Sequence, residues 1–238
     1  MHGFRFISDD LDARDVLSQR ITNAAPRGDN WFRIENKAGA TTADLFIYDE
    51  IGYFGTTAAE FGKTLQALDV DSIDVHINSV GGSVFDGIAI YNALRTHAAK
   101  VTTQVDSAAL SIASVIAQAG ESRTMVSGSQ MMIHEAHGVQ MGFAGDMREM
   151  ADLLDKQTGI IAGIYAERSG KDAAGFEVMM REATWLDADE TVAAGLADDV
   201  LIPSKTDDNE NRSDPGLEQK EAERRRQQAF VDSAQVQL

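Results

Sequence analysis

The chain has 238 residues, 43% of them hydrophobic, which is enough for one full α/β core and some unstructured sequence besides. Its 38 acidic residues outnumber its 21 basic ones, and the net charge of -17 would repel a nucleic-acid backbone over most of the surface. The sequence contains no cysteine, which excludes disulfides, thiolate zinc sites and cysteine nucleophiles.

The N-terminal sequence MHGFRFISDDLDARDVL places acidic residues where a secretory signal would have an apolar stretch. No window of the sequence approaches the roughly 18 apolar residues of a membrane-spanning helix. We therefore expect a soluble, cytoplasmic protein with neither a membrane nor a nucleic acid as its partner.

Residues 1–40 mix charges, glycines and a single proline, Pro26, without a sustained hydrophobic period. This composition predicts an N-terminal arm or leader. The core is expected to begin near Asp44, inside one domain over residues 41–202, and the run DLFIYDEIG predicts its first buried strand.

Strand and helix patterns alternate after this first strand. Thr57 and Glu60 have the spacing of a capping box at the start of a helix. Strands are predicted at residues 74–79 and 100–105, with a helix over residues 84–94 between them. Repeated βα units of this kind predict a largely parallel sheet.

The second half contains two short strand candidates, RTMV and MMIH, and then a long helical pattern from Phe143 to Arg168. This helix has apolar residues at three- and four-residue spacing and needs a partner surface. A last helix is expected from Asp187, a capping residue with Glu190 three positions later, to Gly195.

The composition changes after Pro203. Residues 203–238 are rich in charges and poor in apolar side chains, which predicts a disordered or separately helical tail.

The loop NSVGGSV lies between a predicted strand and a predicted helix. Gly81 and Gly82 have no Cβ, so backbone N–H groups there can closely approach a phosphate or an oxyanion. The loop matches neither G-x-x-x-x-G-K-[ST] nor G-x-G-x-x-G, which disfavours a nucleotide. A glycine-rich turn without a ligand is the alternative interpretation.

Ser111 lies in DSAALSIASVIAQAG, at or near the expected start of a helix, whose N-terminus stabilises nearby negative charge. It is a candidate nucleophile, although a serine at such a place is often a cap or a small packing residue. Ser107 and Ser114 compete with it on composition.

A serine nucleophile needs a neighbouring base, and histidine has the unperturbed pKa that suits this role. His134 ends the strand-like run in MIHEAH, and His137 is its rival. His76 and His97 fall in a predicted strand and helix, where hydrogen-bonded or solvated roles are expected. The phrase H-E-A-H is one residue shorter than the zinc motif H-E-x-x-H, so we expect no metal.

Four segments in this order resemble the Clp peptidase family (ClpP), in the divergent form found among bacteriophage head-maturation proteases. They are INSVGGSVFDGIAIYNAL, VDSAALSIASVIAQAG, MMIHEAHG and ATWLDADETVAAGLAD, and the resemblance covers about residues 44–201. It implies a ClpP/crotonase-like α/β spiral of repeated ββα units. It also implies homo-oligomeric stacked rings around an interior chamber, in which the long helix from Phe143 is the handle where rings meet.

The resemblance also implies the roles of site residues. Ser111 matches the family's nucleophile and His134 its base. The backbone N–H groups of Gly82 and Ile112 match the oxyanion hole.

The sequence departs from the family pattern at three places. Val80 replaces a proline, and Leu110 replaces a small residue before the nucleophile. The family's acid falls on Ala183, so the third triad member is either the adjacent Glu182, after a backbone shift, or absent, leaving a Ser-His dyad.

The function that this resemblance implies is a serine endopeptidase acting through an acyl-enzyme, without a cofactor, on scaffold or capsid protein in phage head maturation. An ATP-driven unfoldase would be a separate partner, because nothing in this chain resembles a nucleotide motor. One alternative is a crotonase-type enzyme acting on acyl-CoA, which shares the glycine oxyanion loop. The other is a catalytically weak or inactive ring component, suggested by Ala183.

Overall fold

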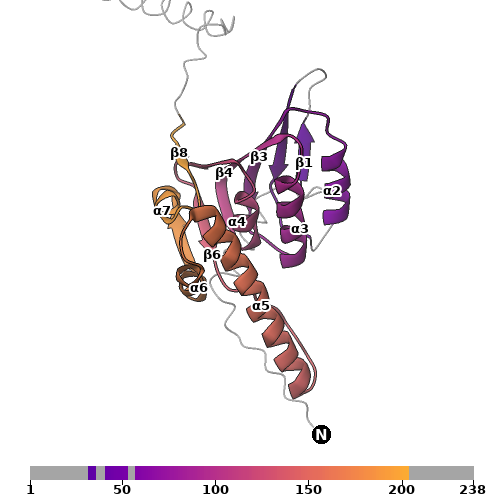
Figure 1. The fold of residues 1–238 in the computed structure, drawn as a ribbon, viewed down its shortest axis with the longest axis vertical. Coiled ribbons are helices and arrows are strands. Elements are labelled where there is room, and N and C mark those ends of the chain that lie inside the picture. Colours follow the sequence, from indigo (N-terminus) through magenta and orange to yellow (C-terminus); the bar gives the residue numbers. More distant parts are fainter. Residues whose placement is uncertain (1–31, 36–40, 53–56, 204–238) are drawn as a thin grey trace, which may run out of the picture. The chain divides into compact units, whose positions relative to one another are not determined.

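The computed structural model describes residues 32–35, 41–52 and 57–203 (Figure 1). In these residues an eight-stranded sheet has the order β1-β2-β3-β4-β5-β8, and β6 pairs with β4 and β7. The strands are β1 (Phe32–Glu35), β2 (Thr42–Ile47), β3 (Ser72–Ser79), β4 (Lys100–Leu110), β5 (Ser122–Val126), β6 (Gln130–Ile133), β7 (Thr184–Asp187) and β8 (Asp199–Leu201). The helices are α2 (Ala58–Gln66), α3 (Val84–Arg95), α4 (Ile112–Ala117), α5 (Ala144–Ser169), α6 (Ala173–Arg181) and α7 (Ala188–Ala194).

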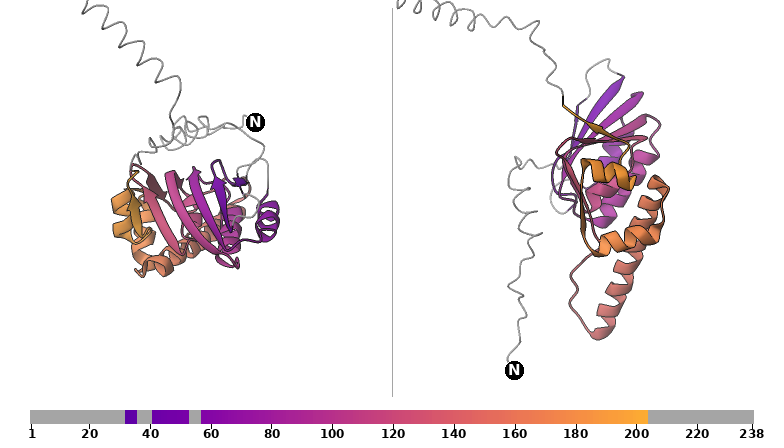
Figure 2. Two further views of the ribbon diagram at one scale, coloured as in Figure 1. Left: turned by 90° about the horizontal axis from the view of Figure 1, so that it is seen from above. Right: turned by 90° about the vertical axis from the view of Figure 1, so that its left-hand side faces the viewer.

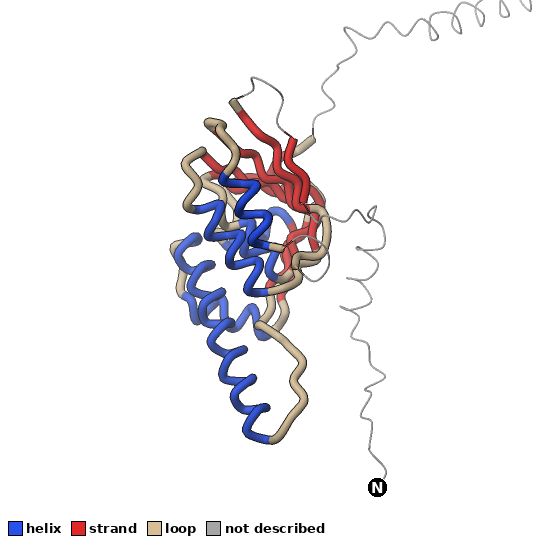
Figure 3. The backbone as a smooth tube through the Cα atoms, turned by 90° about the vertical axis from the view of Figure 1, so that its right-hand side faces the viewer, coloured by secondary structure: helices blue, strands red, loops and turns tan. Residues whose placement is uncertain are grey.

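The sheet is largely parallel, as the repeated βα pattern predicted. Strands β2, β3, β4, β5 and β8 pair in parallel, and so do β4 and β6, whereas the pairs β1–β2 and β6–β7 are antiparallel. The strands lie side by side in Figure 2, and the helices gather on one side of them in Figure 3. This arrangement confirms the mixed α/β fold expected of the ClpP/crotonase-like class.

The core lies between the sheet and these helices. Buried and partly exposed residues alternate along β2 and β3, because successive side chains of a strand point to opposite faces. Leu45, Val75 and Ile77 belong to one apolar cluster with Phe61 of α2 and Ile90 of α3. The helices therefore cover the apolar face of the sheet.

The sheet begins earlier than the boundary at residue 41 that the sequence suggested. Strand β1 falls inside the expected N-terminal arm and pairs antiparallel with β2, with Phe32 opposite Ile47 and Glu35 opposite Asp44. A four-residue strand is too short to show a hydrophobic period, so its pairing with β2 determines its conformation. The rest of the arm and the tail beyond residue 203 lie outside the described residues.

Strand β4 is longer than predicted. It continues past Val105 to Leu110, through Ala108 and Ala109. Ala109 pairs with Ser79 of β3 on one side and with Met131 of β6 on the other. Pairing on both sides overrides the helical preference of alanine.

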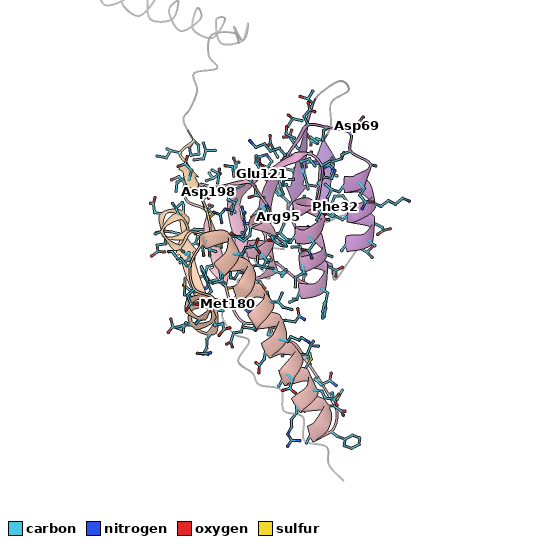
Figure 4. All side chains as sticks on the ribbon, in the orientation of Figure 1. Phe32, Asp69, Arg95, Glu121, Met180 and Asp198 are labelled. Atoms are coloured by element: carbon cyan, nitrogen blue, oxygen red, sulfur yellow. The ribbon has the colours of Figure 1, made fainter. Side chains whose placement is uncertain are left out.

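The long helix predicted from Phe143 is confirmed as α5, which ends at a left-handed Gly170 with φ 70°. Its N-terminal end extends away from the sheet (Figure 1). The buried residues of α5 all lie in its C-terminal half, which packs near α6, the helix that carries Met180 (Figure 4). Helix α6 was not predicted, because it is short and interrupted by Gly175. None of the helices in the described ranges is long and apolar enough to cross a membrane.

Both predicted capping boxes are present. The Thr57 side chain accepts a hydrogen bond from the Glu60 N–H, and the Asp187 side chain accepts one from the Glu190 N–H. Gly195 ends α7 in the left-handed conformation with φ 78°. Because these signals are local, the sequence alone predicted them correctly.

We expect Asp187→Ala to lower the free energy of unfolding by about 1 kcal/mol, because it removes the capping hydrogen bond of α7. Urea denaturation would measure this change. Asp172→Ala is the matched control, since Asp172 occupies the N-cap position of α6 without making a side-chain capping bond. Equal losses in both variants would contradict a specific role for the Asp187 cap.

Candidate active site

Ser111 occupies a strained turn between β4 and α4. Its backbone has φ 55° and ψ -129°, a conformation that non-glycine residues rarely adopt. Its N–H donates to the Met132 carbonyl at 2.9 Å, which ties the turn to β6. The Ser111 side chain makes no capping hydrogen bond to α4, so the alternative interpretation of this residue as a helix cap is not supported.

The pairing of β4 with β6 brings His134 to Ser111. Leu110 lies opposite Met132 in this parallel pair, so the residues that follow the two strands emerge at the same edge of the sheet. The His134 Nε2 atom lies 2.8 Å from Ser111 Oγ. This distance suits a hydroxyl that donates its proton to the imidazole.

The rival residues are placed differently. Ser107 is exposed, whereas Ser114 is fully buried behind the turn. His137 is exposed beside His134, with ring centroids 5.1 Å apart. The 2.8 Å contact between Ser111 and His134 therefore joins the two residues that sequence reasoning favoured.

His76 and His97 form hydrogen bonds with residues other than Ser111, as expected. His76 Nδ1 lies 3.1 Å from Asp106 Oδ2, and the His76 ring stacks on Phe46. His97 Nε2 lies 3.1 Å from the Leu65 carbonyl oxygen.

The glycine loop lies against the nucleophile turn. A Cβ added to Gly81 would lie 2.6 Å from the Leu110 carbonyl oxygen and 2.8 Å from Ser111 Cβ, and its φ of 93° favours glycine. Ile51 holds the other side of the loop, because its N–H donates to Gly81 O at 2.7 Å and its carbonyl accepts from Ser83 N–H at 2.8 Å. No described residue accepts a hydrogen bond from the Gly82 N–H.

A cavity of about 680 Å³ contains these groups. Ser111, His134, Gly82 and Ile112 all line it, so the expected nucleophile, base and oxyanion donors share one space. The cavity can therefore hold a carbonyl group beside the Ser111 hydroxyl and close to two backbone N–H groups.

The cavity wall also carries charged groups that sequence reasoning did not identify. Glu50 follows β2, and its burial, followed by the charge of Asp49, raises its pKa above the ordinary value. Glu135 and Arg181 form an ion pair at 3.5 Å on another part of the wall. Arg181 could not be found from the sequence, because it belongs to the unpredicted helix α6.

Ala183 and Glu182 differ in their relation to the cavity. Ala183 lines it, is 6% exposed and has a left-handed φ of 48°, but its methyl group cannot hydrogen-bond to an imidazole. Glu182 is the exposed C-cap of α6 and does not line the cavity. The geometry thus brings together Ser111, His134 and the two donors, but not Glu182.

Across the described ranges, no group of three or more His, Asp or Glu side chains is arranged to hold a metal ion. His134 and His137 both line the cavity.

Comparison with known proteins gives a consistent match. The family model described as Clp protease matches residues 26–204. The ATP-dependent Clp protease proteolytic subunit of Bacteroides fragilis is 32% identical over 204 residues, which cover 79% of this chain and 97% of that protein. The protein of the same name from Bacteroides thetaiotaomicron is 31% identical and covered to 91%. The one from Leuconostoc citreum is 34% identical over 148 residues, which cover 59% of this chain and 72% of that protein.

We expect Gly81→Ala to slow the reaction of Ser111 with a fluorophosphonate, because the added Cβ would displace the serine and its turn. Stability should also fall, by about 1–3 kcal/mol, from the strain at this left-handed position. Mass spectrometry of the labelled peptide would measure the reaction.

Gly62→Ala is the matched control. Gly62 lies in α2, and an added Cβ there meets no atom within 4 Å. This variant should label at the normal rate and gain about 0.5–1 kcal/mol of stability. Normal labelling of Gly81→Ala would show that the loop does not position the serine.

Proposed function

The chain belongs to the Clp protease family and is a serine-type endopeptidase, and we propose that Ser111 is its nucleophile and His134 its general base. The observation that carries this assignment is the 2.8 Å distance between His134 Nε2 and Ser111 Oγ inside the cavity. The resemblance of the surrounding segments to the family motifs supports the same two residues.

In the proposed reaction, His134 Nε2 takes the proton of Ser111 Oγ as that oxygen attacks the carbonyl carbon of the scissile peptide. The N–H groups of Gly82 and Ile112 bind the oxyanion of the tetrahedral intermediate. The imidazolium then gives its proton to the leaving amine, and an acyl-enzyme remains on Ser111. Water, deprotonated by His134, releases the acyl group by the same steps.

Fluorophosphonate labelling followed by peptide mapping tests the assignment. We expect one modified residue, Ser111, and loss of both labelling and peptidase activity in Ser111→Ala. His134→Gln should label at least about a hundredfold more slowly, because no base would activate the hydroxyl. Modification of another serine would overturn the assignment.

The same experiment separates the two other candidate functions. A folded but unlabelled protein that binds coenzyme A in calorimetry would favour an acyl-CoA enzyme. A folded protein with neither labelling nor coenzyme A binding would favour an inactive ring component, the reading that Ala183 suggests.

We propose that Glu182 is not the triad acid and is at most an auxiliary group beside the Ser111–His134 pair. The exposed side chain of Glu182 and its place outside the cavity lining support this view. Loss of an orienting acid weakens a serine peptidase without abolishing its activity.

Glu182→Gln should therefore leave kcat/KM within about twofold of the unaltered protein, whereas loss of a true triad acid costs about 10⁴-fold in kcat. Steady-state cleavage of a fluorogenic peptide would measure it. Glu177→Gln, a substitution elsewhere on the same helix, is the control. A loss of a hundredfold or more, confined to Glu182→Gln, would identify Glu182 as the third triad member.

We also propose that the chain assembles into stacked homo-oligomeric rings through α5. The residues that precede α5 support this, because Val139, Met141 and Phe143 are 96%, 92% and 87% exposed. Apolar side chains so exposed on one projecting segment favour burial against another subunit.

Phe143→Glu should then separate the stacked rings and roughly halve the particle mass, because a charge would be buried at the ring contact. Analytical ultracentrifugation would measure the mass. Arg148→Gln, on the first turns of the same helix, should leave the mass unchanged. An unchanged mass in Phe143→Glu would place the ring contact elsewhere.

The biological setting that we propose is phage head maturation in the cytoplasm of an infected bacterium or within the prohead, with scaffold or capsid protein as substrate. The resemblance to head-maturation proteases supports this setting. The relatives are named ATP-dependent, so a separate ATP-driven unfoldase is a further partner to be tested. Incubating the purified protein with the capsid protein of its own phage, with and without ATPase partners, would distinguish these settings.

A further inference from the structure

A chain of buried polar groups lies directly behind the nucleophile turn. The Ser111 carbonyl oxygen accepts hydrogen bonds from both the backbone N–H and the side-chain hydroxyl of Ser114. The Ser114 hydroxyl oxygen in turn lies 2.7 Å from the hydroxyl of Tyr165, on α5. Ser114 is 0% exposed and Tyr165 is 1% exposed. Water therefore does not compete for these hydrogen bonds.

The direction of the hydrogen bonds follows from counting protons. A serine hydroxyl carries one hydrogen, and Ser114 donates it to the Ser111 carbonyl. The Tyr165 hydroxyl must therefore donate to Ser114 Oγ. Burial raises the pKa of Tyr165 far above its ordinary value, so the phenol stays protonated and remains a donor.

The Ser111 carbonyl controls an oxyanion donor, because it belongs to the same peptide unit as the Ile112 N–H. A trans peptide is planar, so its C=O and N–H point in opposite directions. When the carbonyl oxygen is held towards Ser114 and Tyr165, the Ile112 N–H is directed away from them. Ile112 lines the cavity, and a Cβ added to Gly81 would lie 3.1 Å from the Ile112 nitrogen, which places this nitrogen beside the glycine loop.

Contacts with the surrounding residues must hold the Ser111–Ile112 peptide in this orientation. Ser111 has φ 55° and ψ -129°, a strained conformation of the kind that persists only where surrounding contacts maintain it. A rotation of the Ser111–Ile112 peptide would relieve the strain and turn its carbonyl, instead of its N–H, towards the cavity. Such a rotated peptide would repel an oxyanion.

We propose that Ser114 and Tyr165 are positioning residues that hold the Ser111–Ile112 peptide in the orientation that binds the oxyanion. This inference rests on the proposed function. It also explains why a second serine lies three residues after the nucleophile: Ser114, a rival nucleophile on composition, is buried and bonded to the carbonyl of the reactive one.

The ring and the hydroxyl of Tyr165 have different roles. Its ring packs against Phe176 of α6, with centroids 5.6 Å apart, and contributes to the core. Only its hydroxyl takes part in the chain of hydrogen bonds. Tyr165→Phe therefore removes the hydrogen bond and keeps the packing. Ser114→Ala removes the side-chain hydrogen bond to the Ser111 carbonyl, keeps the one from the backbone N–H, and leaves the buried Tyr165 hydroxyl without its acceptor.

The experiment compares Ser114→Ala, Tyr165→Phe and the double variant Ser114→Ala/Tyr165→Phe with the unaltered protein. Denaturation should show Ser114→Ala as the least stable of the four, and the double variant should recover part of this loss, since no hydroxyl is left unpaired. The kcat of the double variant should not recover together with its stability. We expect kcat to stay at least about tenfold low in both variants that lack Ser114, and the loss should not exceed the roughly 10²–10³-fold that follows removal of one oxyanion donor.

A split between kcat and KM is the readout that a purely structural role would not produce. KM for a fluorogenic peptide should stay within about twofold, because the donor acts on the transition state more than on the bound substrate. A peptide aldehyde, whose adduct with serine places an oxyanion in the site, should lose affinity by the same factor as kcat. Tyr165→Phe should show a smaller loss, since Ser114 can still donate to Ser111. Tyr91→Phe, at another buried tyrosine, is the matched control.

Two results would overturn the inference: recovery of normal kcat in the double variant, or a loss of kcat that follows stability across the four proteins. Fluorophosphonate labelling of the unaltered protein is done first. If Ser111 is not labelled there, the proposed function fails. If it is labelled and the variants keep normal kcat and aldehyde affinity, only the positioning role fails.

Discussion

The parallel pairing of β4 with β6 is the interaction on which the candidate site depends. Ala108 to Leu110 align with Gln130 to Met132, and the Ser111 N–H extends the ladder to the Met132 carbonyl. A shift of this register by one residue would exchange the faces of β6 and move His134 away from Ser111. The register is therefore as important to the reaction as the two side chains.

Buried alanines and a glycine let neighbouring segments pack closely around the end of β4. The end of β4 lies between β3 and β6, and Ala108, Ala109 and Leu110 are all buried there. Gly81 lets the glycine loop approach the same turn, where any Cβ would meet the Leu110 carbonyl oxygen. The strained backbone of Ser111 is tolerated because contacts from β6, α4 and the glycine loop converge on it.

The sequence predicted those parts of the fold that depend on local patterns. Capping boxes at Thr57 and Asp187, the parallel βα repeats and the long helix from Phe143 are all signalled by residues close to each other. Strand β1, the extension of β4 and helix α6 were missed, because pairing or packing with distant segments determines them. The approach of Ser111 to His134 was expected only because family motifs supply the long-range information that spacing alone does not contain.

The Ser114–Tyr165 hydrogen bond could not be predicted from the sequence either. It lies in the C-terminal half of α5, whose N-terminal half is exposed. The exposed N-terminal half of α5 leaves Met147 and Leu153 at 43% and 40% exposure, which suits the ring contact proposed for this end of the helix. Its buried C-terminal half carries Tyr165 to the back of the nucleophile turn. No spacing rule relates Tyr165 to Ser114, because they lie on different helices and meet only in the folded core. The same continuous helix, Ala144–Ser169, spans both regions. A single helix thus joins the proposed ring contact at its N-terminal end to the hydrogen bond behind the Ser111 turn in its C-terminal half.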